Sequence, residues 1–187
     1  MRKISAGLFI AADGVVESPD KWHFPYFNEE MGAAVTAQIG EADTLLLGRV
    51  TYDGFADAWP ERELAGEEDA GMAKDLGDTR KIVVSASPQA FTWRNSEQLQ
   101  GDLVEAVTAL KAEPGGTIAM SGSISVVRQL LAAGLVDELH LLVHPIAVGA
   151  GMRLFDETAG PIPLKLLRCE TFTTGVLYVV YGPADQA

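Results

Sequence analysis

Three short polar segments of the sequence stand where an apolar run ends, and each contains residue types that can bind phosphate. Glycine lets a ligand approach the backbone, arginine forms forked hydrogen bonds with phosphate oxygens, and free N–H groups at a helix start attract anions. Hydroxyl groups add further donors. The segments supply Gly48, Arg49 and Thr51, then Ser85 with Ser87, and finally Ser121, Gly122 and Ser123.

Each segment also has an ordinary structural interpretation. Residues 48–51 fit a strand-to-helix turn in which Thr51 caps the helix, and Ser123 fits the cap of another helix. Residues 85–87 fit a polar turn before Pro88, and the full Gly-x-Gly-x-x-Gly fingerprint is absent. The occurrence of all three segments at strand ends favours a shared phosphate site.

Apolar periodicity indicates which elements position these segments. Buried strands are predicted at 4–11, 44–47, 81–84 and 117–120, and helices are predicted to begin at Asn28, Asp102 and Ser123, the last ending at Gly134. The pattern then changes to strands at 137–144, 164–173 and 176–181, with a hairpin turn at 173–175. We therefore predict an α/β fold of three layers, α/β/α, in which a mixed and mostly parallel central sheet ends in antiparallel strands.

Composition bounds the class of protein. The 187 residues fit one domain, 1–187, and the acidic segment 61–78 is interpreted as a solvated helix or surface excursion. The net charge of −12 argues against nucleic acid and anionic membranes as partners, and no uncharged run is long enough to span a bilayer. The N-terminus lacks signal-peptide features and Cys169 is the single cysteine, so we expect a cytoplasmic protein.

In this order and spacing, the motifs resemble the dihydrofolate reductase superfamily, in particular its riboflavin-biosynthesis reductase branch. The resemblance covers nearly the whole chain, from the first strand and Asp13-Gly14 through residues 22–25 (Trp-His-Phe-Pro) to the Pro-x-x-x-Gly-x-Gly stretch at 145–151. It implies that NADPH binds and passes a hydride to a small heterocycle, pterin-like or aminopyrimidine-like. It places the cofactor against Gly14, Gly48, Arg49, Thr51, Ser85, Ser121, Gly122, Ser123 and Ile124.

The sequence departs from that pattern at one informative position. Dihydrofolate reductases place a carboxylate shortly after their Trp-x-x-Pro stretch, where it supports protonation of the pterin; here the position is Phe27. Dihydrofolate is therefore a doubtful substrate, and Asp13 becomes the candidate catalytic proton donor or substrate anchor. Asp13 also fits a turn with Gly14, and both interpretations stay open. We expect Trp22, Phe24 and Phe27 to border the substrate pocket.

The riboflavin branch often joins this reductase to a zinc deaminase, which needs cysteines that this chain lacks, so a stand-alone reductase domain is expected. His140 and His144 are interpreted as structural or surface residues because a strand holds them roughly 13 Å apart, too far to share a metal ion. His23 is expected to be solvated. No metal site is predicted.

Two functional hypotheses remain open. The first is an NADPH-dependent reductase, and the second is a non-catalytic NADP(H)- or ligand-binding protein on the same fold, motivated by the aromatic residue at Phe27. The strands at 139–143 and 176–181 are apolar on both faces, so another layer or subunit must cover them. A homodimer is the expected assembly.

Overall fold

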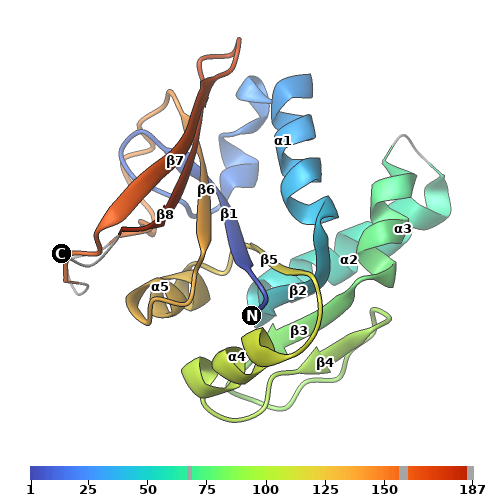
Figure 1. The fold of residues 1–187 in the computed structure, drawn as a ribbon. Helices are drawn as coiled ribbons and strands as arrows, with labels where there is room; N and C mark the ends of the chain where they lie inside the picture. Colours follow the sequence, from blue (N-terminus) through green and yellow to red (C-terminus); the bar gives the residue numbers. More distant parts are fainter. Residues whose placement is uncertain (67–68, 156–159, 185–187) are drawn as a thin grey trace.

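The computed structural model describes residues 1–66, 69–155 and 160–184, and its centre is one eight-stranded sheet (Figure 1). The strands are β1 (Ile4–Ala11), β2 (Ala42–Gly48), β3 (Arg80–Val84), β4 (Ser96–Gln98), β5 (Thr117–Ser121), β6 (Glu138–His144), β7 (Leu164–Thr171) and β8 (Leu177–Pro183). Their order is β4-β3-β2-β5-β1-β6-β8-β7, and only the pairs β6–β8 and β8–β7 are antiparallel among the described residues. The predicted fold class is confirmed, and the short strand β4 was not predicted.

Helices cover both faces of the sheet and complete the three layers. They are α1 (Glu29–Gly40), α2 (Arg49–Ala65), α3 (Ala70–Asp78), α4 (Leu103–Ala112) and α5 (Ile124–Ala132), with 3-10 turns η1 (Pro19–Lys21) and η2 (Phe24–Tyr26). Helices α4 and α5 pack on one face through Val107, Leu110, Val127 and Leu130, against strand residues such as Leu8. Helices α1, α2 and α3 pack on the other face.

The predicted helix starts at Asn28 and Asp102 are confirmed by their hydrogen bonds. Asn28 Oδ1 accepts from Met31 N–H at 3.0 Å, and Asp102 Oδ1 accepts from Val104 N–H at 2.9 Å. Each cap satisfies a donor that the first turn of a helix leaves free. The predicted C-terminal stop is also present, because Gly134 has φ +67 directly after α5.

The chain itself covers the strands that the sequence marked as apolar on both faces. Leu139 and Val179 join the core beneath α4 and α5, whereas Leu142, Tyr178 and Val180 pack against α1 on the opposite face. The β7–β8 hairpin turns at Gly175, with φ +83, as the predicted turn requires. The apolar character of β6 and β8 is therefore explained without a second subunit.

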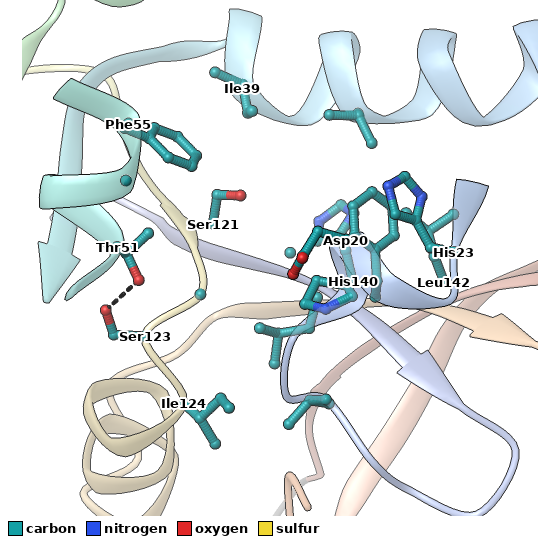
Figure 2. Close-up of a pocket in the computed structure, with 18 of the residues that line it drawn as sticks. Asp20, His23, Ile39, Thr51, Phe55, Ser121, Ser123, Ile124, His140 and Leu142 are labelled. Atoms are coloured by element: carbon teal, nitrogen blue, oxygen red, sulfur yellow. Dashed lines mark hydrogen bonds between the residues drawn. The ribbon is translucent and has the colours of Figure 1, made fainter. Parts of the chain in front are cut away.

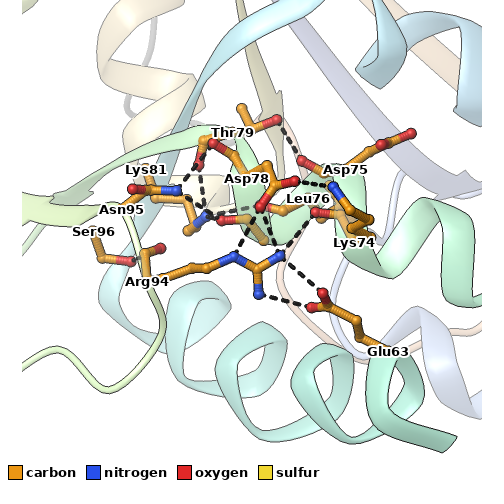
Figure 3. A network of polar contacts seen from close by, with 11 residues as sticks. Glu63, Lys74, Asp75, Leu76, Asp78, Thr79, Lys81, Arg94, Asn95 and Ser96 are labelled. Atoms are coloured by element: carbon orange, nitrogen blue, oxygen red, sulfur yellow. Dashed lines mark hydrogen bonds and ion pairs between the residues drawn. The ribbon is translucent and has the colours of Figure 1, made fainter.

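The acidic segment 61–78 forms the end of α2 and all of α3, except that Glu67 and Glu68 lie outside the described residues. It is only partly a solvated excursion, because Ala73 and Leu76 are buried. The Arg94 guanidinium joins the two helices: it donates to both carboxylate oxygens of Glu63, at 2.7 and 3.0 Å, and to Asp78 (Figure 3).

Lys81 is fully buried beside this network. Its ammonium group donates to the carbonyls of Leu76, Gly77 and Thr79 at 2.7, 2.9 and 2.6 Å, and so satisfies the C-terminal end of α3 (Figure 3). It also lies 4.2 Å from the centroid of the Trp93 ring, a favourable cation–π contact. Burial lowers the pKa of Lys81 to about 8. Among the described residues, no helix is long and apolar enough to cross a membrane.

Candidate active site

A cavity of about 950 Å³ lies between helices α1 and α2 and the face of the sheet that they cover (Figure 2). Strands β2 and β5 end at this cavity, and its lining includes the first turns of the helices that follow them, residues 50–51 and 123–125. In open α/β sheets, ligands bind beyond the carboxyl ends of strands. The volume lies in the range typical of small-molecule sites, roughly 300–1,000 Å³.

The hydroxyl group of Ser123 joins the two helix starts that border the cavity. Its Oγ accepts a 2.7 Å hydrogen bond from Gly48 N–H and lies 2.8 Å from Thr51 Oγ1 (Figure 2). Gly48 ends β2 and Ser123 follows β5, which are neighbouring strands, so one side chain fixes the spacing of two strand ends. The predicted convergence of Thr51, Ser123 and their strand ends is visible here.

Both helices begin without a side-chain cap in the described structure. Ser123 precedes α5, but its hydroxyl is engaged with α2; Gly48 precedes α2 and has no side chain to offer. The predicted capping role of Thr51 is wrong, because α2 begins at Arg49 and Thr51 lies within its first turn. Val126 N–H in the first turn of α5 donates to Ser123 O, but no side chain caps the other first-turn N–H groups of α2 and α5 in the described structure. An anion could bind these groups, and the helix dipoles favour negative charge there.

Two glycines keep open the corner of the cavity between the starts of α2 and α5. Gly122 has φ +79, and a Cβ at that position would lie 3.4 Å from Thr51 Oγ1. A Cβ at Gly48 would lie 2.3 Å from Ser123 Oγ, a distance that would force the serine to move. Gly122, with Ser121, Ser123 and Ile124, lines the cavity (Figure 2). Backbone without a side chain thus borders the space that a phosphate would need.

Arg49 and Ser85 lie at the same edge of the sheet but outside the cavity lining. The half-exposed Arg49 guanidinium forms a 3.3 Å ion pair with Asp53 one helical turn later. Ser85 follows Val84, the residue paired with Gly48, and its hydroxyl donates to Ser87 O at 2.9 Å. Both side chains flank the corner between the starts of α2 and α5 rather than form its wall.

The structure places Asp13 and Gly14 in a turn after β1, outside the described lining of the cavity. Asp13 Oδ2 accepts a 2.7 Å hydrogen bond from Gly149 N–H, and this bond lowers the pKa of the Asp13 carboxyl group. Gly14 has φ +86, as a tight turn requires. The structure shows the contacts of a turn, including the hydrogen bond to Gly149 in the Pro-x-x-x-Gly-x-Gly stretch. The proton-donor role of Asp13 stays a prediction.

The three predicted pocket aromatics have different positions. Phe24 lines the cavity, and the residue is 64% exposed, so its ring is accessible to a ligand. Trp22 is buried behind the pocket, where its indole donates to Glu17 O at 3.0 Å. Phe27 is exposed and stands at the edge of the His23 ring, at a centroid distance of 6.1 Å. Of the three, only Phe24 belongs to the described cavity wall.

His23, expected to be solvated, is instead 7% exposed and lines the cavity (Figure 2). Its ring stacks on Phe9 at a centroid distance of 4.6 Å and lies 4.2 Å from Phe24. Burial lowers the pKa of His23, so the imidazole is neutral at pH 7. Its Nδ1 has no hydrogen-bond partner among the described residues. No sequence pattern marks this residue, apart from its place next to Trp22.

His140 and Tyr178, from β6 and β8, form the inner end of the cavity. His140 Nδ1 lies 2.7 Å from the Tyr178 hydroxyl oxygen, and its Nε2 lies 3.3 Å from Glu138 Oε2. The sequence interpretation of His140 as a structural or surface residue did not foresee that it lines the cavity, where its side chain is 13% exposed. His144, four residues later, is fully buried among aromatic rings, and its interpretation as structural is consistent with that packing.

The charged residues of the lining are acidic. Glu17 and Asp20 belong to the loop after β1, and the described lining includes no lysine or arginine. Most of the surface is apolar, with Val35, Ile39 and Phe55 supplied by α1 and α2. Among the described residues, no group of three or more His, Cys, Asp or Glu side chains is arranged to hold a metal ion.

Solved structures with this architecture define the fold class. The chain is similar to a candidate riboflavin biosynthesis protein from Shewanella sp. PV-4, with a TM-score of 0.75, 18% identity and coverage of 99% of this chain and 100% of that one. Dihydrofolate reductase from Enterococcus faecalis, complexed with NADP(H) and RAB-propyl, gives a TM-score of 0.62 at 17% identity, with coverage of 98% and 97%. The fold is that of the dihydrofolate reductase class.

The family follows from the sequence itself. Residues 2–178 match the model of the RibD C-terminal domain, and the chain belongs to that family. It is 29% identical over 187 residues to the uncharacterized protein YyaP of Bacillus subtilis, with 96% of this chain and 94% of that protein covered. The resemblance recognised from the strand-end motifs is thereby confirmed.

Proposed function

We propose that this protein is a reductase that uses NADPH to reduce a small heterocyclic substrate, pterin-like or aminopyrimidine-like. The observation that carries the proposal is the pair of uncapped helix starts, joined by Ser123, at the ends of two neighbouring strands beside a 950 Å³ cavity. This is the local chemistry that a dinucleotide pyrophosphate requires. Membership of the RibD C-terminal domain family and the fold shared with dihydrofolate reductase support a reductase-type function.

The donor set fits the cofactor. First-turn N–H groups of α2 and α5, with the Thr51 and Ser123 hydroxyls, would hold the pyrophosphate, and Gly122 would let it approach the backbone. Arg49 and Ser85 flank this corner and would meet the phosphate on the adenine ribose. When bound, the nicotinamide supplies a hydride; the protein orients both reactants and excludes water.

The substrate side of the cavity favours an aromatic ring that carries no negative charge. The exposed Phe24 ring and the neutral His23 imidazole offer stacking surfaces, while Glu17 and Asp20 supply the negative charge of the lining. A substrate that carries its own phosphate would meet no lysine or arginine in the described lining. We therefore expect an unphosphorylated heterocycle to be preferred over its phosphorylated form.

A non-catalytic NADP(H)-binding protein is the second candidate. The exposed Phe27 favours it, because this aromatic side chain has no proton to transfer where dihydrofolate reductases have a carboxylate. The two candidates share the phosphate corner and differ only in what happens at the nicotinamide. The acidic composition and single cysteine support a cytoplasmic location in either case.

Nicotinamide fluorescence on titration of purified protein with NADPH tests the shared part of the proposal. Absorbance at the nicotinamide band, with pterins, aminopyrimidine ribosides and quinone-like compounds as acceptors, then separates the candidates. Oxidation of bound NADPH by any acceptor supports the reductase. Binding without oxidation by the whole panel favours the non-catalytic protein, and no binding at high micromolar NADPH overturns both.

A further inference from the structure

The inner end of the cavity is a polar site within an otherwise apolar face of the sheet. His140 and Tyr178 lie there on adjacent strands, and Tyr178 is 5% exposed. Gly7 is the β1 residue paired with His140, and it also lines the cavity. A Cβ at Gly7 would lie 2.7 Å from the Gln38 amide oxygen, so glycine lets the Gln38 side chain pack closely against this part of the sheet.

The hydrogen bonds of this site fix its protonation pattern. The Glu138 carboxylate only accepts hydrogen bonds, so His140 Nε2, 3.3 Å away, carries a proton. In the neutral imidazole, Nδ1 is then unprotonated and accepts from the Tyr178 hydroxyl at 2.7 Å. When His140 is protonated, Nδ1–H donates to the Tyr178 oxygen instead, and the hydroxyl proton is released to face the cavity.

We propose that Tyr178 is the catalytic residue that protonates the substrate, and that His140 is the reservoir that returns a proton to it. The inference rests on the proposed reductase function and names the source of its proton. Tyr178 is chosen because both ring nitrogens of His140 are already engaged, whereas Tyr178 lines the cavity and its hydroxyl bonds to His140 alone among the described residues. Asp13 lies outside the cavity and does not reach this end.

The step balances in atoms and charge. The reduced dinucleotide named above is the two-electron donor, and the acceptor carbon of a C=N, C=C or C=O group gains the hydride. The other atom of that double bond takes the Tyr178 hydroxyl proton, so the double bond becomes single. The phenolic oxygen takes the Nδ1 proton of His140, which leaves a neutral imidazole; solvent later restores the imidazolium.

Charged and polar groups from several packed elements face the His140–Tyr178 pair. Glu138 accepts from Lys3 Nζ at 2.7 Å, which orients the carboxylate toward His140. On the far side, the Arg168 guanidinium, paired with Glu170, lies 5.2 Å from the centroid of the Tyr178 ring. The neighbouring helix α1 contributes the neutral Gln38.

Three more distant groups complete the set: Glu41 at the end of α1 acts on Tyr178 through its charge, and Asp20 and His23 line the cavity. Burial raises the pKa of Tyr178, which keeps the donor form intact at neutral pH, and burial lowers the pKa of His140. Protonation of His140 is therefore confined to acidic pH, and the relay works best there.

Tyr178→Phe tests the relay, with Tyr181→Phe as a matched control on the same strand but the opposite face of the sheet. With an acceptor that the wild type reduces, we expect Tyr178→Phe to lower the reduction rate about 100-fold while NADPH fluorescence titrations stay within about twofold. The wild-type rate should fall as pH rises through the pKa of His140, and the variant rate should lose that dependence. Tyr181→Phe should match the wild type.

A second readout does not depend on activity or cofactor. ¹⁵N NMR of histidine-labelled protein above pH 8 should show His140 with a proton on Nε2 and none on Nδ1. The opposite tautomer overturns the relay even if Tyr178→Phe fails to fold. An unchanged rate and pH profile in a folded Tyr178→Phe also overturns it, although NADPH oxidation by the wild type would leave the reductase intact. If the wild type binds NADPH but reduces no acceptor, the reductase and the relay fall together.

Discussion

The hydroxyl oxygens of Ser123 and Thr51 lie 2.8 Å apart, although 72 residues separate them in the chain. This contact holds the start of α5 against the start of α2. The same serine accepts from Gly48 N–H, so it cannot cap its own helix. The Ser123 side chain thus aligns two helix starts instead of capping one of them. Neither helix has a side-chain cap, so N–H groups in their first turns remain beside the cavity without one.

Gly122→Ala should weaken NADPH binding about tenfold or more. The substitution places a Cβ 3.4 Å from Thr51 Oγ1 at the phosphate corner and strains a backbone with φ +79. Gly134→Ala is the matched control: its φ is +67, but a Cβ there meets nothing within 4 Å. Both variants should lose a similar amount of stability in urea, about 1 kcal/mol, and only Gly122→Ala should lose affinity by fluorescence titration. Equal affinities in the two variants would show that Gly122 is not near the phosphates.

Ser123→Ala should reduce both alignment and cofactor affinity. It removes the acceptor of Gly48 N–H and the partner of the Thr51 hydroxyl, so we expect a loss of about 1 kcal/mol in unfolding free energy. NADPH affinity should fall about tenfold, measured by titration calorimetry. Thr108→Ala, on the exposed face of α4, removes a hydroxyl that bonds only to Val104 O and should leave affinity unchanged. A Ser123→Ala protein with wild-type affinity would contradict the role of this link.

Lys81→Met should destabilise the fold by about 2–4 kcal/mol at pH 7, because three carbonyl groups lose their buried donor. The difference in unfolding free energy between the wild type and Lys81→Met should also depend on pH. Between pH 8 and 10.5 the folded wild type has released the Lys81 proton while the unfolded chain still holds it, so wild-type stability relative to the variant rises, by about 2–3 kcal/mol in all. Urea unfolding of both proteins at pH 7, 8.5 and 10 measures this. A pH-independent difference would mean that the pKa of Lys81 is not lowered.

The homodimer expected from the sequence stays a prediction. We expect its interface on β7, the outer strand of the sheet. Leu166 and Leu167 are 53% and 51% exposed on a strand with an unpaired edge among the described residues. Leu166→Glu should convert a dimer to a monomer in sedimentation velocity, and the melting temperature should fall because the folded chain loses its partner. Leu64→Glu, at a position 88% exposed on α2, is the control. A monomeric wild type would rule out the dimer.

Local signals in the sequence predicted the fold well where the chemistry is local. Asn28 and Asp102 bond to N–H groups two or three residues away, and Gly134 and Gly175 adopt the backbone angles that their turns need. The strand-end motifs were found for a similar reason: the carboxyl ends of neighbouring parallel strands must meet at one edge of the sheet. Thr51 was misjudged because the start of α2 is fixed by a tertiary contact with Ser123.

The substrate side was largely missed for a physical reason. Alternation along β6 shows that His140 and Leu142 share a face, but not that this face borders a cavity together with Gly7 of β1. Likewise, His23 is buried against the rings of Phe9 on β1 and His144 on β6, which reach it only in the folded chain. Such residues are revealed by packing between elements, which no local pattern encodes.

We propose above that the starts of α2 and α5 together hold the phosphates of NADPH. Backbone ¹H–¹⁵N NMR of the labelled protein, recorded before and after addition of NADPH, tests it most directly. We expect the amide signals of Val50, Thr51, Ile124 and Ser125 to shift most, with those at the capped starts of α1 and α4 unmoved. Saturable NADPH binding that leaves those four amides unchanged would contradict the account.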